Sequence, residues 1–121
     1  MKKTMARIAK IAAITIVIFC AASCASTKKM YSWYSYQSDY YHFLKNADEN
    51  SYNKLIKTYD KIIQNQKEVR GVVPPGIYAD YGYLLMEKGK EAEAKEMFAK
   101  EIELYPESAV FIGSILKRFE K

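Results

Sequence analysis

The stretch "IYADYGYLLMEKGKEAEAKEMFAKEIELYP", residues 77–106, decides the fold that this sequence predicts. It divides into two helices, which we expect at about 76–88 and 91–104. Gly89 lies between them and is the residue type that most often ends a helix, and Pro106 stops the second helix. The stretch therefore predicts a helical hairpin.

The hairpin carries small residues where its two helices would meet. Gly82 and Ala94 allow the helices to approach closely, and Phe98 would fill the space beyond them. At a series of fixed positions the stretch resembles a tetratricopeptide repeat. The matching residues are Tyr78, Tyr81, Gly82, Leu85, Gly89, Ala94, Phe98, Leu104 and Pro106. The resemblance implies an all-α fold in which pairs of helices stack on one another.

The part of the chain before this hairpin predicts further helices and no convincing strand. One helix is expected at about 31–45, and a second at about 52–69, capped by Asn50 or Ser51. The first of these would place four aromatic residues on one face: Trp33, Tyr36, Tyr40 and Phe43. The predicted fold is therefore a tetratricopeptide-like array of about five helices after an N-terminal signal segment.

The array divides into three parts within a domain at 31–121. Residues 31–70 form a diverged repeat and residues 75–106 the clear repeat. Residues 107–121 form a C-terminal cap helix, begun by Ser108, which covers the last apolar face of the stack.

The first 23 residues resemble a secretory signal peptide. Four basic residues precede an apolar run of about a dozen residues, shorter than the roughly 20 that span a bilayer. The run ends in "AASC", Ala21 to Cys24, which resembles the lipobox of bacterial lipoproteins. We therefore expect a signal peptide at 1–23, lipidation of Cys24 and a short tether at 24–30. An uncleaved anchor or a plain signal peptide is the alternative.

Removal of this segment changes the charge balance. The whole chain has a formal net charge of +5, whereas the part from Cys24 onward carries 15 basic and 14 acidic residues. That balance lacks the basic surplus of nucleic-acid-binding proteins, so we expect no nucleic-acid partner. Cys24 is followed by Ala25 and Ser26, and neither is the aspartate that retains lipoproteins at the inner membrane. We therefore expect a lipid-anchored protein on the periplasmic face of the outer membrane.

A narrower resemblance covers nearly the whole chain after the signal segment. Three stretches resemble a family of small bacterial lipoproteins that carry a domain of unknown function: "YSWYSYQSDYYHFLK" at 31–45, "PPGIYADYGYLLMEKGK" at 74–90 and "EIELYPESAVF" at 101–111. The resemblance implies a gene neighbourhood shared with a CsgG-like lipoprotein, similar to the curli-secretion pore component, and with a further small lipoprotein. It carries over no biochemical activity.

The sequence offers little for catalysis or metal binding. His42 is the only histidine, and no free cysteine would remain after processing, so we expect no metal site and no cofactor. A Ser-His-acid triad, a Gly-rich phosphate loop and an HExxH motif are absent from the sequence. We therefore expect a protein that is not an enzyme, with a cell-wall-acting enzyme as a remote alternative.

Two surfaces are candidates for binding. In the geometry of the repeat, Ala79, Tyr83, Met86 and Glu87 would face a concave groove suited to a protein partner. The same four residues also fit an ordinary exposed helix face. The aromatic stretch at 31–41 fits either the membrane interface or the core, and its helical spacing favours the core.

These features predict a function in protein assembly. We expect a non-catalytic adaptor that helps assemble or stabilise a lipoprotein or secretion-type complex, with a CsgG-like lipoprotein as a candidate partner. The alternative is a pilotin-like periplasmic chaperone that holds an exported subunit. A stable stoichiometric complex in detergent would favour the adaptor.

Glu101 departs from the repeat pattern, because a small residue normally occupies its position. It lies on the packed face with Phe98, where an isolated carboxylate needs polar partners. We expect two partners, the start of the last helix at 107–109 and a tyrosine hydroxyl from Tyr78 or Tyr81. Glu101 is therefore predicted to tie the repeat to the cap helix rather than to act as a catalytic acid.

Overall fold

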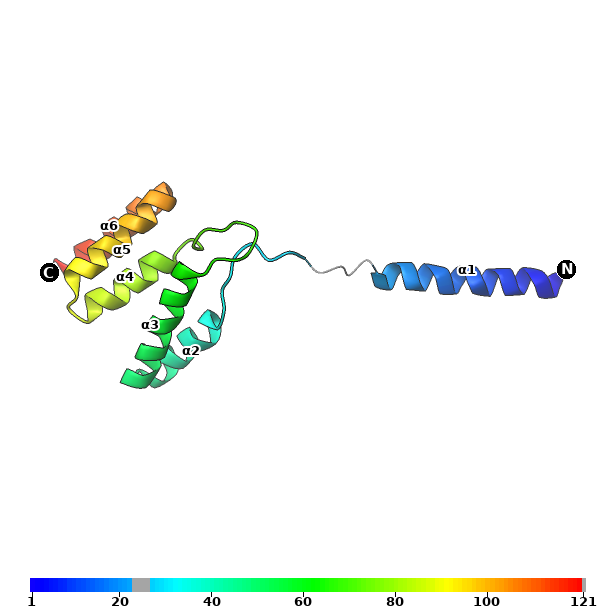
Figure 1. Ribbon diagram of the computed structural model, residues 1–121, viewed down its shortest axis with the longest axis horizontal. Coiled ribbons are helices and arrows are strands. Elements are labelled where there is room, and N and C mark those ends of the chain that lie inside the picture. Colours follow the sequence, from blue (N-terminus) through cyan, green and yellow to red (C-terminus); the bar gives the residue numbers. More distant parts are fainter. Residues whose placement is uncertain (23–26, 121) are drawn as a thin grey trace.

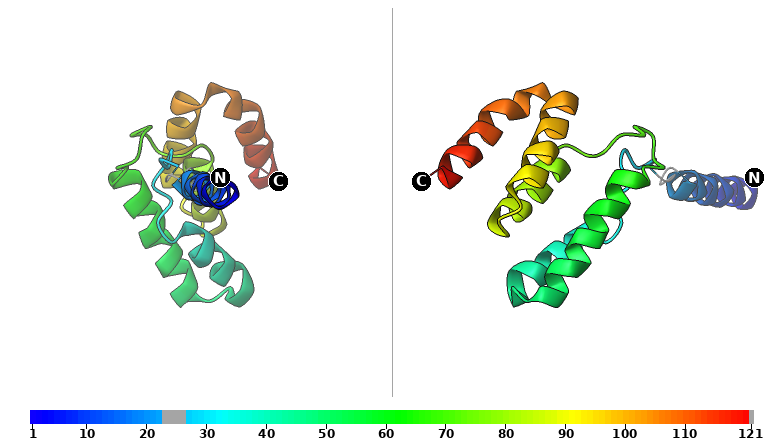
Figure 2. Two further views of the ribbon diagram at one scale, coloured as in Figure 1. Left: turned by 90° about the vertical axis from the view of Figure 1, so that its right-hand side faces the viewer. Right: turned by 60° about the vertical axis from the view of Figure 1, so that its left-hand side comes forward.

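The computed structural model describes residues 1–22 and 27–120, and that part of the chain contains only helices and connecting segments, without a strand (Figure 1). The prediction of an all-α fold is confirmed. Figure 2 shows two antiparallel helix pairs, α2 with α3 and α4 with α5, followed by α6. The elements are α1 (Lys2–Ala22), α2 (Tyr36–Asn46), α3 (Glu49–Gln64), α4 (Ile77–Glu87), α5 (Glu91–Leu104), the 3-10 helix η1 (Pro106–Ser108) and α6 (Ala109–Phe119).

Residues 1–18, which include most of helix α1, take no part in the hydrophobic core. Every side chain of residues 1–18 is exposed, and both core clusters described below are formed by residues 36–116. Among the described residues, no helix has the length and apolar character needed to cross a membrane. Cys24 lies outside the described residues, so its lipidation and the cleavage before it stay predictions.

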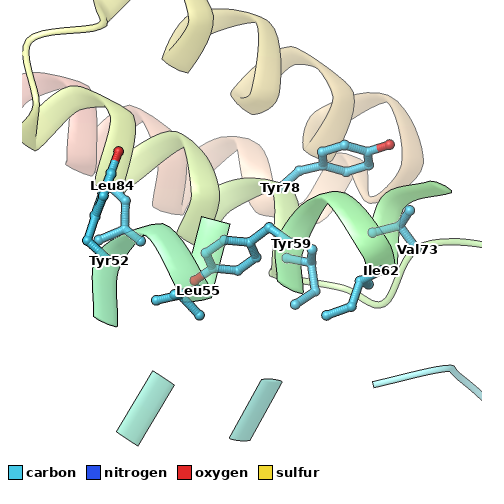
Figure 3. Packing of buried hydrophobic residues seen from close by; sticks show 8 residues of the cluster. Tyr52, Leu55, Tyr59, Ile62, Val73, Tyr78 and Leu84 are labelled. Carbon is cyan, nitrogen blue, oxygen red and sulfur yellow. The ribbon is translucent and has the colours of Figure 1, made fainter. Parts of the chain in front are cut away.

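The first hydrophobic cluster packs α3 against α4. Leu55, Tyr59 and Ile62 project from α3 and are fully buried (Figure 3). Three aromatic residues of α2 also pack against this cluster: Tyr36, Tyr40 and Phe43. Its buried members are Tyr52, Leu55, Tyr59, Ile62, Val73, Ile77, Tyr78 and Leu84. This apolar burial supplies most of the force that joins the two helix pairs.

The second cluster joins α4, α5 and α6. Its buried members are Ala79, Leu85, Ala94, Phe98, Ile112 and Ile115. Tyr81 of α4 and Met97 of α5 pack against both clusters. The two helix pairs and the last helix therefore share one continuous core.

The α4–α5 pair packs closely at Gly82. A Cβ atom added there would lie 2.7 and 2.8 Å from two ring carbons of Phe98, and 3.1 Å from the carbonyl oxygen of Ala94. Phe98 and Ala94 are themselves buried. Because those distances are shorter than normal carbon contacts, the close approach of the two helices requires glycine at this position.

The first predicted helix begins too early. Helix α2 starts at Tyr36, five residues later than predicted, and Tyr34 has a positive φ of 48°. The Ser32 N–H donates to Gln66 Oε1 at 2.9 Å, and Gln66 Nε2 donates back to the Ser32 carbonyl at 3.0 Å. The backbone of this segment is thus bonded to a distant part of the chain and not to a helix of its own.

The second predicted helix is also shifted. Helix α3 spans Glu49–Gln64 rather than 52–69, and its N-cap is Asp48. Asp48 Oδ1 accepts a hydrogen bond from the Ser51 N–H at 2.7 Å. Ser51 therefore belongs to the first turn as a donor and is not the capping residue. Helices α4 and α5 agree with their predicted ranges to within one residue.

A buried carboxylate joins α2 to α3. Asp39 Oδ2 accepts hydrogen bonds from Ser35 Oγ at 2.6 Å and Thr58 Oγ1 at 2.7 Å, and Lys54 Nζ lies 3.0 Å from Oδ1. Burial acts to raise the pKa of Asp39. The hydrogen bonds and the Lys54 charge outweigh it and hold the pKa below its ordinary value. The charged side chain of Asp39 therefore stabilises the interface between α2 and α3.

Candidate functional site

An open hollow of about 260 Å³ lies between α2 and α4. Helix α4 presents four lining residues at intervals of three and four, so they share one helical face. The lining residues are Tyr40, Phe43 and Leu44 from α2, and Asp80, Tyr83, Leu84 and Glu87 from α4. None of them is basic. The hollow therefore combines aromatic and apolar walls with two carboxylates.

Asp80 is fixed in position by Tyr36. The Tyr36 hydroxyl donates to Asp80 Oδ2 at 2.5 Å. Burial raises the pKa of Asp80, while this hydrogen bond acts in the opposite direction. Burial and the Asp80 carboxylate together raise the pKa of Tyr36 far above its ordinary value, so its hydroxyl stays protonated and keeps donating. The carboxylate therefore has one defined orientation.

Asp80 and Glu87 make the local potential of the hollow negative. Burial raises the pKa of Tyr40, and the charges of Asp80 and Glu87 raise it further. Hydrogen bonding to Glu87 and the charge of that carboxylate raise the pKa of the Tyr83 hydroxyl, and Arg118 of α6 acts in the opposite direction. Negative potential beside these partly exposed rings favours a cationic group.

The structure separates the four residues that were predicted to form one groove. Tyr83 and Glu87 line the α2–α4 hollow. Met86 lines a different hollow beside α5 and α6. Ala79 is buried in the second cluster, since α6 packs over that side of α4. The expectation of Ala79 and Met86 in the same groove as Tyr83 was therefore wrong.

Five lining residues were missed from the sequence. Asp80 and Leu84 stand at helical spacing from Tyr83 and Glu87, and this spacing was available as a signal. The three residues from α2 depend on how the two helix pairs pack. That packing rests on long-range contacts such as the Tyr36–Asp80 hydrogen bond, for which a single helix pattern gives no indication.

Comparison with known proteins gives one match. A family model described as a domain of unknown function (DUF4810) matches residues 30–115, which is more than half of the chain. The chain belongs to the DUF4810 family. No curated protein and no solved structure matches it. The DUF4810 match includes the buried residues of both core clusters and the α2–α4 hollow, and it begins after α1.

Besides the α2–α4 hollow, the DUF4810 domain has a second unusual feature, the buried carboxylate of Glu101. Its side chain is fully buried, and its Oε1 atom accepts a hydrogen bond from the Gly76 N–H at 2.7 Å. The Ser108 hydroxyl lies 3.5 Å from the same oxygen. Gly76 precedes α4 with a φ of 92°, a conformation that favours glycine. Glu101 therefore links the end of α5 to the start of α4 and to the segment before α6.

The partners of Glu101 differ in part from those expected: Ser108 lies in the predicted range 107–109, but it approaches Glu101 with its hydroxyl and not with a backbone N–H. The predicted tyrosine partners do not bind it, because Tyr81 donates to Asp60 at 3.3 Å and Tyr78 makes no hydrogen bond to Glu101 in the described part of the chain. Ser108 does not cap α6 with its side chain, since its hydroxyl turns toward Glu101. The strongest partner, the Gly76 N–H, was not foreseen.

Replacing Glu101 with alanine is expected to destabilise the DUF4810 domain by about 1–3 kcal/mol. The change leaves the Gly76 N–H without its acceptor and opens a space in the core. Urea unfolding followed by circular dichroism measures the difference. Glu101→Gln keeps an oxygen acceptor at this site, so it should lose clearly less stability than Glu101→Ala. An alanine variant as stable as the parent would contradict the structural role.

Proposed function

We propose that this chain is a non-catalytic, lipid-anchored adaptor on the periplasmic face of the outer membrane. It binds a protein partner through the α2–α4 hollow and so helps assemble a lipoprotein or secretion-type complex. The anchoring and the location rest on the signal-type N-terminus and the "AASC" stretch that ends in Cys24. The binding role rests on the hollow.

The arrangement of the helix pairs supports this role. We interpret α2–α3 and α4–α5 as two tetratricopeptide-like repeats and α6 as their cap. The close contact of Gly82 with Phe98 and Ala94 supports this interpretation of the second pair. Stacked repeats of this kind offer their first helices to partners on one surface. Here the first helices are α2 and α4, which line the hollow.

The chemistry of the hollow indicates what it binds. Tyr40 and Tyr83 offer partly exposed rings, and Asp80 and Glu87 offer carboxylates without a basic residue among the lining side chains. A lysine or arginine side chain on the partner would contact the rings through a cation–π interaction and the carboxylates through opposite charge. The observation that carries the proposal is this combination of aromatic walls and unbalanced negative charge. A CsgG-like lipoprotein stays the candidate partner by resemblance.

Changes at the rim of the hollow test the adaptor role. Tyr83→Ser combined with Glu87→Lys is expected to lower recovery of the partner about tenfold or more, since an aromatic anchor is lost and a cation is repelled. The measurement is affinity purification of the lipidated protein from its own membrane in detergent, with the co-purifying protein quantified. Asp80 is left unchanged because its bond to Tyr36 also supports the fold.

A control variant carries the same kind of charge change elsewhere. Glu103 is an exposed residue of α5 outside the lining of the hollow, so Glu103→Lys should leave partner recovery within about twofold. Circular dichroism of each variant checks that helical content is preserved. Unchanged recovery with the Tyr83 and Glu87 substitutions would remove this site from the proposal.

A further inference from the structure

The segment that leads into the domain is built into a fixed platform. Residues 29–34 run alongside residues 65–70 (Figure 1), with the Arg70 N–H donating to the Met30 carbonyl at 3.1 Å and the Lys67 N–H to Ser32 Oγ at 3.0 Å. The Tyr34 hydroxyl donates to the Asn65 carbonyl. We call residues 29–34 and 65–70, together with Lys61, the N-terminal platform.

The platform exposes large apolar and aromatic side chains. The exposed fractions are 54% for Met30, 42% for Trp33, 39% for Tyr34 and 66% for Val69. The aromatic stretch was predicted to favour the core, and Tyr36, Tyr40 and Phe43 do pack there. Trp33 and Tyr34 precede α2 and stay partly exposed, although the Trp33 ring lies 5.7 Å from the Tyr36 ring. Tryptophan and tyrosine with this exposure suit a membrane–water interface.

Basic side chains surround these residues. Lys29 and Lys67 line an open hollow of about 340 Å³ together with Trp33 and Tyr34. Lys61 Nζ lies 4.5 Å from the centre of the Tyr34 ring. Arg70 adds a fourth positive charge, with its guanidinium carbon 6.0 Å from the centre of the Tyr31 ring. Glu68 is the single acidic residue of the platform, so the surface is positive.

We propose that the N-terminal platform docks directly on a lipid bilayer that carries anionic headgroups. Trp33, Tyr34, Met30 and Val69 enter the interfacial region, while the lysines and Arg70 contact headgroup phosphates. The bilayer is the occupant that fits because the surface pairs exposed aromatic rings with surplus positive charge. This interaction is separate from the adaptor function, since the platform shares no residue with the α2–α4 hollow.

The position of the platform supports a membrane contact. It begins five residues after Cys24, a distance of less than about 20 Å even for a fully extended chain. A lipid on Cys24 would therefore hold the platform near the bilayer surface. The proposal does not require that lipid, because the platform's own side chains make the contact.

Fluorescence of Trp33 tests the proposal directly, since Trp33 is the only tryptophan of the chain. The chain from residue 27 to residue 121 contains both core clusters and lacks α1, so any membrane binding comes from the folded domain. With vesicles of phosphatidylcholine and phosphatidylglycerol, Trp33 emission should shift to shorter wavelength and be quenched by brominated acyl chains. Emission that does not change at millimolar lipid overturns the proposal.

A matched pair of charge reversals locates the contact. Lys29→Glu with Lys67→Glu should lower the vesicle partition coefficient about tenfold or more, because two attractive charges become repulsive. Lys45→Glu with Lys117→Glu makes the same change in net charge at exposed sites outside the platform. This control pair should lower the partition coefficient by no more than about threefold. Equal losses for the two pairs overturn the assignment to the platform. The assay contains no protein partner, so its result is independent of the adaptor proposal.

Discussion

Replacing Tyr59 with alanine is expected to lower the free energy of unfolding by about 3–5 kcal/mol, enough to unfold much of this small domain. The Tyr59 side chain is fully buried. Its ring stacks on Tyr81 with centroids 5.1 Å apart and planes 9° apart, and lies 5.7 Å from the ring of Tyr36. Alanine would leave a large cavity where α2, α3 and α4 meet.

The phenylalanine variant is the matched control. The Tyr59 hydroxyl is buried without a hydrogen-bond partner in the described part of the chain. Removing that hydroxyl relieves the cost of its desolvation. The free energy of unfolding of Tyr59→Phe should therefore lie within about 1 kcal/mol of the parent value, or above it. Urea unfolding at neutral pH, followed at 222 nm and by near-ultraviolet dichroism, compares the three proteins. A loss of more than about 2 kcal/mol in Tyr59→Phe would show that the hydroxyl is bonded.

The second large effect is expected at Gly82. Alanine normally stabilises a helix by about 1 kcal/mol relative to glycine. At Gly82 the added Cβ would meet the buried ring of Phe98 at 2.7 Å, so Gly82→Ala should instead destabilise the domain by about 1–3 kcal/mol. Valine at this position adds further atoms to the clash, so Gly82→Val should destabilise the domain by more than Gly82→Ala does.

Gly113 provides the internal control for that substitution. It lies within α6, and a Cβ added there would meet no atom within 4 Å. Gly113→Ala should therefore stabilise the domain by about 0.5–1 kcal/mol, as helix propensity predicts. Thermal melts of the two alanine variants should shift in opposite directions. Shifts in the same direction would show that the α4–α5 contact is looser than the structure indicates.

The α4–α5 pair could be predicted from the sequence because its signals are local. Gly89 and Pro106 mark its ends, and the small residues at Gly82 and Ala94 mark its interface within one stretch of about 30 residues. Both helices were found at the predicted positions to within one residue. Nothing outside the stretch was needed to place them.

The segment before α2 was misjudged for the opposite reason. Trp33 and Tyr36 are spaced as in a helix, yet the backbone at Ser32 bonds to Gln66, which lies 34 residues away. Helical periodicity gives no information about such a partner. The partner of Glu101 was missed in the same way, because Gly76 lies 25 residues earlier in the chain.

The candidate site was half predictable. Tyr83 and Glu87 follow from the face of α4, whereas Tyr40 and Leu44 enter the hollow only because the first helix pair packs against the second. Where the site depends on one helix, its residues could be identified in advance. Where it depends on the packing of two pairs, the sequence pattern of each pair was insufficient.

The pairing of Ser32 with Gln66 has a mechanical consequence. A pulling force applied through the N-terminal segment reaches the bonds of Ser32, Gln66 and Arg70 before it reaches α2. These bonds join two stretches of backbone side by side, so they share the load and pass it to the end of α3. A pull on the N-terminal segment therefore loads the end of α3 before it loads the first turn of α2.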